Sequence, residues 1–401
     1  MVVFAALALY SCNNDDKIDV SFTVSTTTSG ENYYNGLTLQ MGLAGTTDVK
    51  VEAVVDAEGK AVFKTDLSQY AGKDVWFCVP KMVKFFHQVS ESEATANSIV
   101  LPNKDNGSTV DATGLKNDWI VALYMGVNKD GKADAAPLYW ATGNILVVKT
   151  NAPGDHSELA YHIATAQETE MEGTSGNSLV MMDQRLIPNV FDAYANMPAG
   201  STWDMFAFGD ITGLMLYDNE HLEQYCIDTK QINQDKTEIA YNISGDARYD
   251  AARAQLGGLW RLPTCGKTGE NEFAAFEDDA QEYASLLPNG TGYGEPRVSF
   301  GIQYDYTVNI NGKDLTVNTL KLPATGFRHA TDMAAGTAIL CLYWSGTADP
   351  TGTPAYEPGV DQSGQKVDVW KTAFNYGYLT QMKKWFTHPR TSSQSLRPVT
   401  E

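Results

Sequence analysis

The chain has 401 residues, of which 43% are hydrophobic and 11% aromatic, and it carries a formal net charge of −20. This length exceeds one ordinary domain, and the apolar content together with 34 glycines and 20 tyrosines favours sheets and turns over long helices. So acidic a surface repels nucleic-acid phosphates and anionic lipid, so we expect neither as a direct partner.

The first residues have the pattern of an export signal. The apolar stretch VVFAALALYSC (2–12) is about ten residues long, too short to span a bilayer as a helix. Its end, Leu9-Tyr10-Ser11-Cys12, resembles the lipobox of bacterial lipoproteins. The resemblance implies that residues 1–12 are signal and lipobox and that acyl chains on Cys12 anchor the protein at the cell surface of the outer membrane. Membrane contact is expected only through this anchor.

Short strands separated by turn residues follow from residue 13 to residue 136. DVKVEAVV and AVFKTDL, joined by DAEGK, predict a β-hairpin. VWFCV and DWIVALYMG predict two further strands, with polar loops between them. The pattern predicts an antiparallel β-sandwich for residues 13–136, and its layout resembles the N-terminal domain of fimbrillin-type pilus proteins.

Helices and strands are mixed in the remainder of the chain. ISGDARYDAARAQLGG (243–258) predicts a short helix that Asp246 or Asp250 caps and Gly257 ends. GENEFAAFEDDAQEYASLL (269–287) predicts a second helix. KDLTVNTLKLPATGF, GTAILCLYWSGT and the closing SLRPVT predict strands.

Arginine and tryptophan recur in related short segments, which are GGLWRLPT (257–264), LPATGFR (322–328) and SLRPVTE (395–401). An arginine can lay its stem along apolar surface while its guanidinium group binds several carbonyl oxygens, so we expect a structural role. A row of arginines that binds an anionic ligand is the alternative interpretation. The predicted structural set is Trp260, Arg261, Arg328, Trp344 and Arg397.

These segments, together with LYWATGN (138–144), DMFAFGD (204–210) and YWSGT (343–347), occur in the order typical of one protein family. Residues 137–401 resemble the FISUMP (Fibrobacter major paralogous) domain, a secreted and often lipid-anchored module of C-type-lectin-like fold. The resemblance implies two helices beside a small antiparallel sheet whose first and last strands pair. We therefore expect a mainly β fold, in which an N-terminal antiparallel β-sandwich precedes a C-type-lectin-like α+β domain.

Motifs of catalysis or metal binding do not occur in the sequence. There is no GxSxG and no CxxC, and VNKDGKAD (127–134) would place Gly126 and Pro137 at essential EF-hand ligand positions. We expect no enzyme activity, no metal and no cofactor. The enzymatic alternative is a formylglycine-generating-type enzyme, which shares the lectin-like fold, but the paired cysteines of that class are missing. The sequence does not decide whether Cys78, Cys226, Cys265 and Cys341 are free thiols or form disulfides in one of three possible pairings.

The resemblance to lectins implies a binding face in the loops between the middle strands and the last strand, here residues 346–394. Sugar rings stack on exposed aromatic side chains, which also dominate protein interfaces. The sequence therefore predicts a cell-surface binding protein or adhesin, with a fimbrial tip component as one form, that recognises a glycan or a host or bacterial surface protein. A structural subunit of a surface assembly, with pilus subunits as partners, is the alternative. The candidate ligand-binding residues are Trp370, Tyr376, Tyr378, Trp385 and His388.

Overall fold

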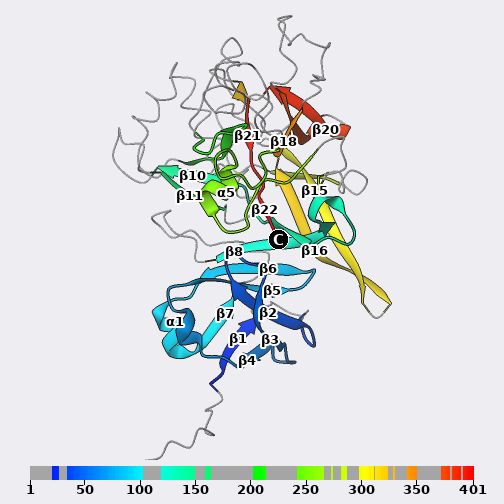
Figure 1. Ribbon diagram of the computed structural model, residues 1–401. Coiled ribbons are helices and arrows are strands. Elements are labelled where there is room, and N and C mark those ends of the chain that lie inside the picture. Colours follow the sequence, from blue (N-terminus) through cyan, green and yellow to red (C-terminus); the bar gives the residue numbers. More distant parts are fainter. Residues whose placement is uncertain are drawn as a thin grey trace, which may run out of the picture.

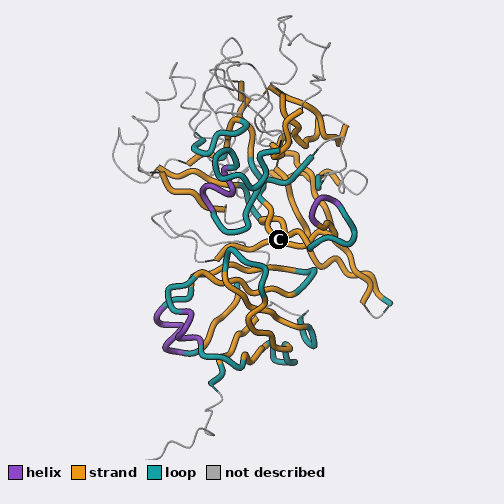
Figure 2. The backbone as a smooth tube through the Cα atoms, viewed as in Figure 1, coloured by secondary structure: helices purple, strands orange, loops and turns teal. Residues whose placement is uncertain are grey.

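A computed structural model of the chain forms a mainly β fold of several antiparallel sheets with β-sandwich character (Figures 1 and 2). This confirms the predicted mainly β class. Two short α-helices, α1 (Glu91–Ala96) and α5 (Ala251–Leu256), occur among the described residues. The structure describes residues 20–26, 34–102, 119–149, 159–163, 202–213, 242–265, 272–273, 281–286, 298–310, 312–323, 328–329, 341–349, 372–379, 382–389 and 392–401.

The largest sheet has seven strands in the order β22-β9-β8-β6-β5-β2-β3. Its strands come from both ends of the chain, because β22 pairs antiparallel with β9 and β9 pairs with β8. The hairpin β8–β9 thus crosses the expected domain boundary between residues 136 and 137. The strands are β2 (Thr38–Leu43), β3 (Val49–Val54), β5 (Asp74–Val79), β6 (Val83–Gln88), β8 (Trp119–Asn128), β9 (Pro137–Ala141) and β22 (Val399–Thr400).

Both faces of the strands β5 and β8 of this central sheet are buried, since their alternate residues enter two different cores. Val75 and Phe77 of β5 belong to the first core, whereas Trp76 and Cys78 belong to the second. This explains why the strands read as nearly continuous apolar runs rather than as apolar and polar residues in alternation. The predicted strands at 74–79 and 118–126 are confirmed.

A three-stranded sheet in the order β4-β1-β7 packs on the first core and completes the sandwich. Its strands are β1 (Phe22–Thr26), β4 (Lys60–Phe63) and β7 (Ser98–Leu101). The predicted hairpin of residues 48–67 is wrong in its pairing: β3 pairs with β2 and β4 pairs with β1. The turn at residues 56–60 therefore carries the chain from one layer to the other, with Phe63 stacked on Phe22 at 5.0 Å between ring centroids.

The first predicted helix is confirmed and the second is wrong over its last part. Asp250 caps α5, because its carboxylate accepts hydrogen bonds from the backbone amides of Ala252 and Arg253, and Gly257 follows with φ of 69°. Residues 281–286, by contrast, form strand β14 (Gln281–Leu286), which pairs with β15 (Val298–Ile310) over six residues. Helical propensity is weak enough for such tertiary pairing to override it.

Most of the remaining strands lie above the central sheet in Figure 1, on the side away from β1 and β4. Several of them contribute side chains to the second core, among them Ile145, Ile163 and Trp344. β15 and β16 (Lys313–Pro323) form a long hairpin that Asn318 fastens to the central sheet through hydrogen bonds to the carbonyl oxygens of Met82 and Tyr124. The other elements are η1 (Leu67–Tyr70), η2 (Lys129–Gly131), β10 (Ile145–Lys149), β11 (Leu159–Ile163), β12 (Thr202–Trp203), β13 (Met205–Ala207), β17 (Arg328–His329), β18 (Cys341–Asp349), β19 (Thr372–Leu379), β20 (Met382–Pro389) and β21 (Ser392–Ser395).

Candidate ligand-binding groove

A groove of about 770 Å³ opens where the second face of the central sheet meets the glycine-rich loop after α5. This volume lies in the range of pockets that bind small molecules or parts of a chain molecule. The lining comes from residues 43–46, residues 72–75, Lys84, residues 86–88, Ile120, residues 256–260 and residues 400–401. The groove is therefore built from segments that are hundreds of residues apart in the sequence.

Glycines form much of one wall. Gly45 and Gly258 adopt positive φ angles of 84° and 56°, and a Cβ atom on Gly258 would lie 3.3 Å from the backbone nitrogen of Gly45. The two loops consequently touch backbone to backbone, which only glycine permits at this spacing. The pair of glycines in GGLW thus has two purposes: Gly257 ends the helix, and Gly258 allows the close approach.

Aromatic side chains make the floor. The rings of Phe86 and Trp260 lie 5.0 Å apart between centroids, and Phe86 is half-exposed to the groove. Trp76, beside them, donates a hydrogen bond from Nε1 to the carbonyl oxygen of Thr46 at 2.9 Å. A Cβ atom on Gly42 would lie only 2.2 Å from Cζ2 of Trp76 and 2.5 Å from the backbone oxygen of Asp48, so a glycine is needed there for the ring to pack behind Phe86.

Lys84 places an ammonium group among these rings. Its Nζ lies 4.5 Å from the ring centroid of Trp76 and 5.7 Å from that of Tyr139, within the range of cation–π attraction. Nζ also donates a hydrogen bond to the main-chain oxygen of Glu401. Burial lowers the pKa of Lys84 to about 8, because removal from water disfavours the charged form more than Cys78 and Glu401 favour it.

His87, on one side of the groove, is fixed by contacts with Trp119 and with Glu93, a residue of the α1 capping box. His87 stacks on Trp119 with 4.0 Å between ring centroids, and its Nε2 lies 2.8 Å from a carboxylate oxygen of Glu93. Glu93 is also part of the capping box of α1, in which it binds the backbone amide of Ser90. Hydrogen bonds from His87 and Ser90 lower the pKa of the Glu93 carboxyl group against the opposing effect of burial.

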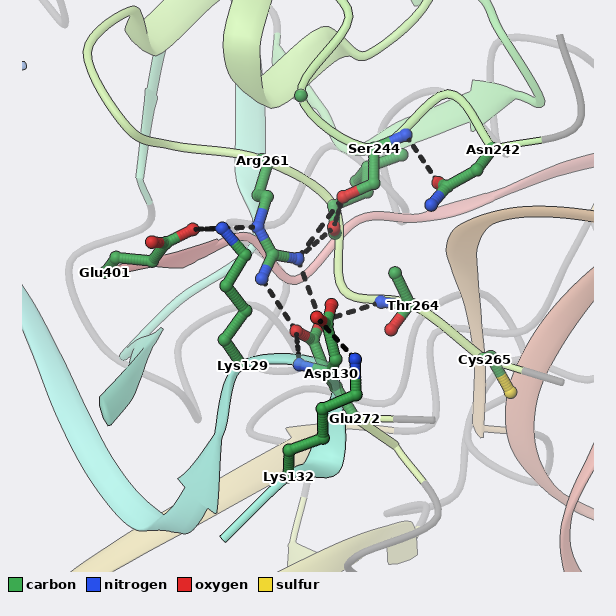
Figure 3. A network of polar contacts seen from close by, with 12 residues as sticks. Lys129, Asp130, Lys132, Asn242, Ser244, Arg261, Thr264, Cys265, Glu272 and Glu401 are labelled. Carbon is green, nitrogen blue, oxygen red and sulfur yellow. Dashed lines mark hydrogen bonds and ion pairs between the residues drawn. The ribbon is translucent and has the colours of Figure 1, made fainter. Parts of the chain in front are cut away.

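A buried ion pair lies next to the lining residues Trp260 and Glu401 and is part of the network shown in Figure 3. Arg261 donates two hydrogen bonds to the Glu272 carboxylate at 2.6 and 2.8 Å, and both side chains are almost fully removed from solvent. The same carboxylate accepts bonds at 2.9 Å from the backbone amides of Asp130 and Thr264. Arg261 therefore joins the loop after α5 to η2, which gives it a structural role.

A second buried network joins the sequence motifs of residues 138–144, 204–210 and 395–401. Arg397 donates to Oδ1 of Asn144 at 3.0 Å and to the carbonyl oxygen of Thr142 at 2.7 Å. Asn144 and Ser395 donate in turn to Oδ2 of Asp204. Burial raises the pKa of Asp204 to about 6, although these two hydrogen bonds oppose the shift.

The other predicted structural residues are placed as follows. Trp344 is fully buried in β18 and donates from Nε1 to the carbonyl oxygen of Phe206 at 3.1 Å. Arg328 lies on β17, in register with Ser393 of β21.

None of the predicted ligand-binding residues is in the part of the groove lining that the structure describes. The expectation that residues 346–394 are loops is wrong for 372–379 and 382–389, which are the paired strands β19 and β20. In that hairpin Tyr376 is the register partner of Trp385, Tyr378 of Lys383, and Ala373 of His388. Backbone hydrogen bonding between neighbouring segments organises this stretch into sheet. Trp370 and the lipid-attachment candidate Cys12 lie outside the described residues.

The structure shows the state of two of the four cysteines that follow Cys12. Cys78 and Cys265 are buried thiols outside any disulfide. Cys78 lies 3.2 Å from the hydroxyl oxygen of Tyr139, and burial raises the pKa of its thiol. Cys341 lies on β18, and Cys226 is outside the described residues.

Comparisons with models of known protein families, with curated proteins and with solved structures find no match to this chain. The groove therefore has to be interpreted from its own chemistry. Among the described residues, no cluster of three or more His, Cys, Asp or Glu side chains could hold a metal ion. Within the same part of the chain, no helix is long and apolar enough to cross a membrane.

Proposed function

We propose that the protein is a lipid-anchored binding protein of the bacterial cell surface that takes a glycan chain into the groove between the central sheet and the loop after α5. The observation that carries this proposal is the groove itself, which combines aromatic rings with polar groups. Phe86 and Ile120 offer apolar surface for the face of a sugar ring, and Lys73 and Gln88 offer hydrogen-bond donors at the rim. We further propose that the chain is an adhesin rather than an enzyme.

The FISUMP and fimbrillin resemblances stay proposals about family and agree with this function. Under them, acyl chains on Cys12 would hold the protein at the outer membrane. The groove would then face outward to a glycan, or to a surface protein that carries one.

A filled groove tests the proposal. Ala44→Trp adds an indole ring to the half-buried lining, and Ala57→Trp adds the same ring to an exposed turn outside the lining. We expect wild type and Ala57→Trp to bind the same glycans on an array and Ala44→Trp to lose them, with all three folded by circular dichroism. Equal binding by the folded Ala44→Trp variant would refute the groove as the site. If Ala44→Trp still binds and Trp385→Ala does not, the binding site lies on the β19–β20 hairpin.

A further inference from the structure

The charge along the groove differs from that of the whole chain. The protein carries −20, yet both Lys73 and Lys84 line the groove. Of the lining carboxylates, that of Glu401 is bound by Lys129 at 2.6 Å and lies 3.9 Å from Nε of Arg261. The other, Asp74, is exposed at the rim. Because Lys129 neutralises Glu401 and Asp74 offsets Lys73, one positive charge of the lining is left uncompensated, that of Lys84, and it attracts anions.

Two polar groups of the lining have hydrogen-bonding capacity left. The Lys84 ammonium has three N–H donors, and the described residues supply one acceptor, the main-chain oxygen of Glu401. Thr400 is fully buried, and its hydroxyl has no hydrogen-bond partner among the described residues. Buried polar groups are almost always paired, so both groups call for an acceptor oxygen from outside the described chain.

Both groups belong to one face of the central sheet. Thr400 is the register partner of Tyr139, whose ring lies 5.7 Å from Nζ of Lys84. Residues in direct register share a face of the sheet, so the hydroxyl and the ammonium lie on the same face, on which the Tyr139 ring links them. Phe86, which is half-exposed, lies on the same face at 5.6 Å from Nζ.

We propose that the ligand of the groove is an acidic glycan, and that the carboxylate of a uronic-acid residue accepts hydrogen bonds from the Lys84 ammonium and the Thr400 hydroxyl while the sugar ring packs on Phe86. This inference rests on the proposed function and names the class of glycan. Hydrogen bonds between charged groups are about twice as strong as neutral ones, so the carboxylate dominates recognition. The lowered pKa of Lys84 agrees with this, because the stabilisation of the ammonium by protein groups is smaller than the stabilisation by water that it loses on burial.

Matched ligands and variants test the inference by isothermal titration calorimetry. The ligands are tetragalacturonate and its methyl ester, which keeps every ring and removes the charges. The acid should bind wild type at least about tenfold more tightly than the ester. Lys84→Met keeps most of the apolar stem and should weaken binding of the acid by about 10- to 100-fold without changing that of the ester. Lys60→Met, an exposed lysine outside the lining, is the control and should bind like wild type.

A second variant keeps the test decisive if Lys84→Met does not fold. Thr400→Val preserves shape and removes only the hydroxyl, and it should weaken binding of the acid by about two- to tenfold. Equal affinity for acid and ester would overturn the inference and leave the groove intact as a site for neutral glycans. Binding of neither ligand would also overturn it, and the glycan array would then decide separately whether the groove binds any glycan.

Discussion

The ion pair of Arg261 and Glu272 yields the sharpest prediction about stability. Glu272→Gln replaces one carboxylate oxygen by an NH₂ group. In the wild type each oxygen accepts one bond from Arg261 and one backbone amide bond, from Asp130 or Thr264. The new NH₂ group is itself a donor, and it would point at two buried N–H donors, one from Arg261 and one from the backbone. The substitution also removes the negative charge that compensates the guanidinium group. A buried donor left unsatisfied costs about 1–3 kcal/mol, and breaking a buried ion pair costs about 3–5 kcal/mol.

We expect Glu272→Gln to lower the free energy of unfolding by about 3–5 kcal/mol, measured by urea denaturation followed by tryptophan fluorescence and circular dichroism. The matched control is Asp246→Asn. Asp246 also binds an arginine through both its oxygens, but the side chain of that arginine, Arg248, is 71% exposed. Solvent screens such a pair, so its loss should cost less than about 1 kcal/mol.

Two outcomes would refute this reasoning. Equal costs for the buried and the exposed pair would mean that burial does not set the magnitude. A double variant, Arg261→Met with Glu272→Gln, should recover part of the loss, since it removes the unpaired guanidinium group while the glutamine carbonyl oxygen still accepts a backbone amide. A double variant less stable than Glu272→Gln alone would show that the ion pair is not what the single change disturbs.

Three further predictions concern the anchor, pH and packing. Cys12→Ala should move the protein from the membrane fraction to the soluble fraction and abolish palmitate labelling; retained labelling would refute the lipobox interpretation. Because the folded-state pKa of Asp204 is about 6, above its ordinary 3.8, protonation of Asp204 stabilises the fold, and this contribution is lost as pH rises from about 4 to 6. Relative to Asp204→Asn, wild type should therefore lose about 3 kcal/mol between pH 4 and pH 7 in urea titrations, and parallel pH profiles would contradict this. Gly42→Ala should cost about 1–3 kcal/mol by overpacking against Trp76, and Trp76→Phe should relieve part of that cost; a neutral Gly42→Ala would show that the ring moves freely.

Local patterns in the sequence were enough for several features of the fold. The apolar runs at 74–79 and 118–126 are strands because such runs can be buried only in a sheet or a core helix, and their turn residues favour a sheet. Asp250 and Gly257 mark the ends of α5 because capping depends on neighbours two or three residues away. The expectation that Arg261 and Arg397 bind protein oxygen atoms follows from their apolar surroundings, and both lie in buried networks.

Only the tertiary structure decided which strands pair and which residues line the groove. In VKFFHQ (83–88), Lys84 occupies a position that reads as the solvent side of an alternating strand. It is buried because residues 399–401, more than 300 positions later, extend the same sheet and cover it. Likewise residues 281–286 have a helical pattern but become a strand because β15 is there to pair with them. Contacts between distant segments depend on the register of the whole sheet, and no local spacing in the sequence records that register.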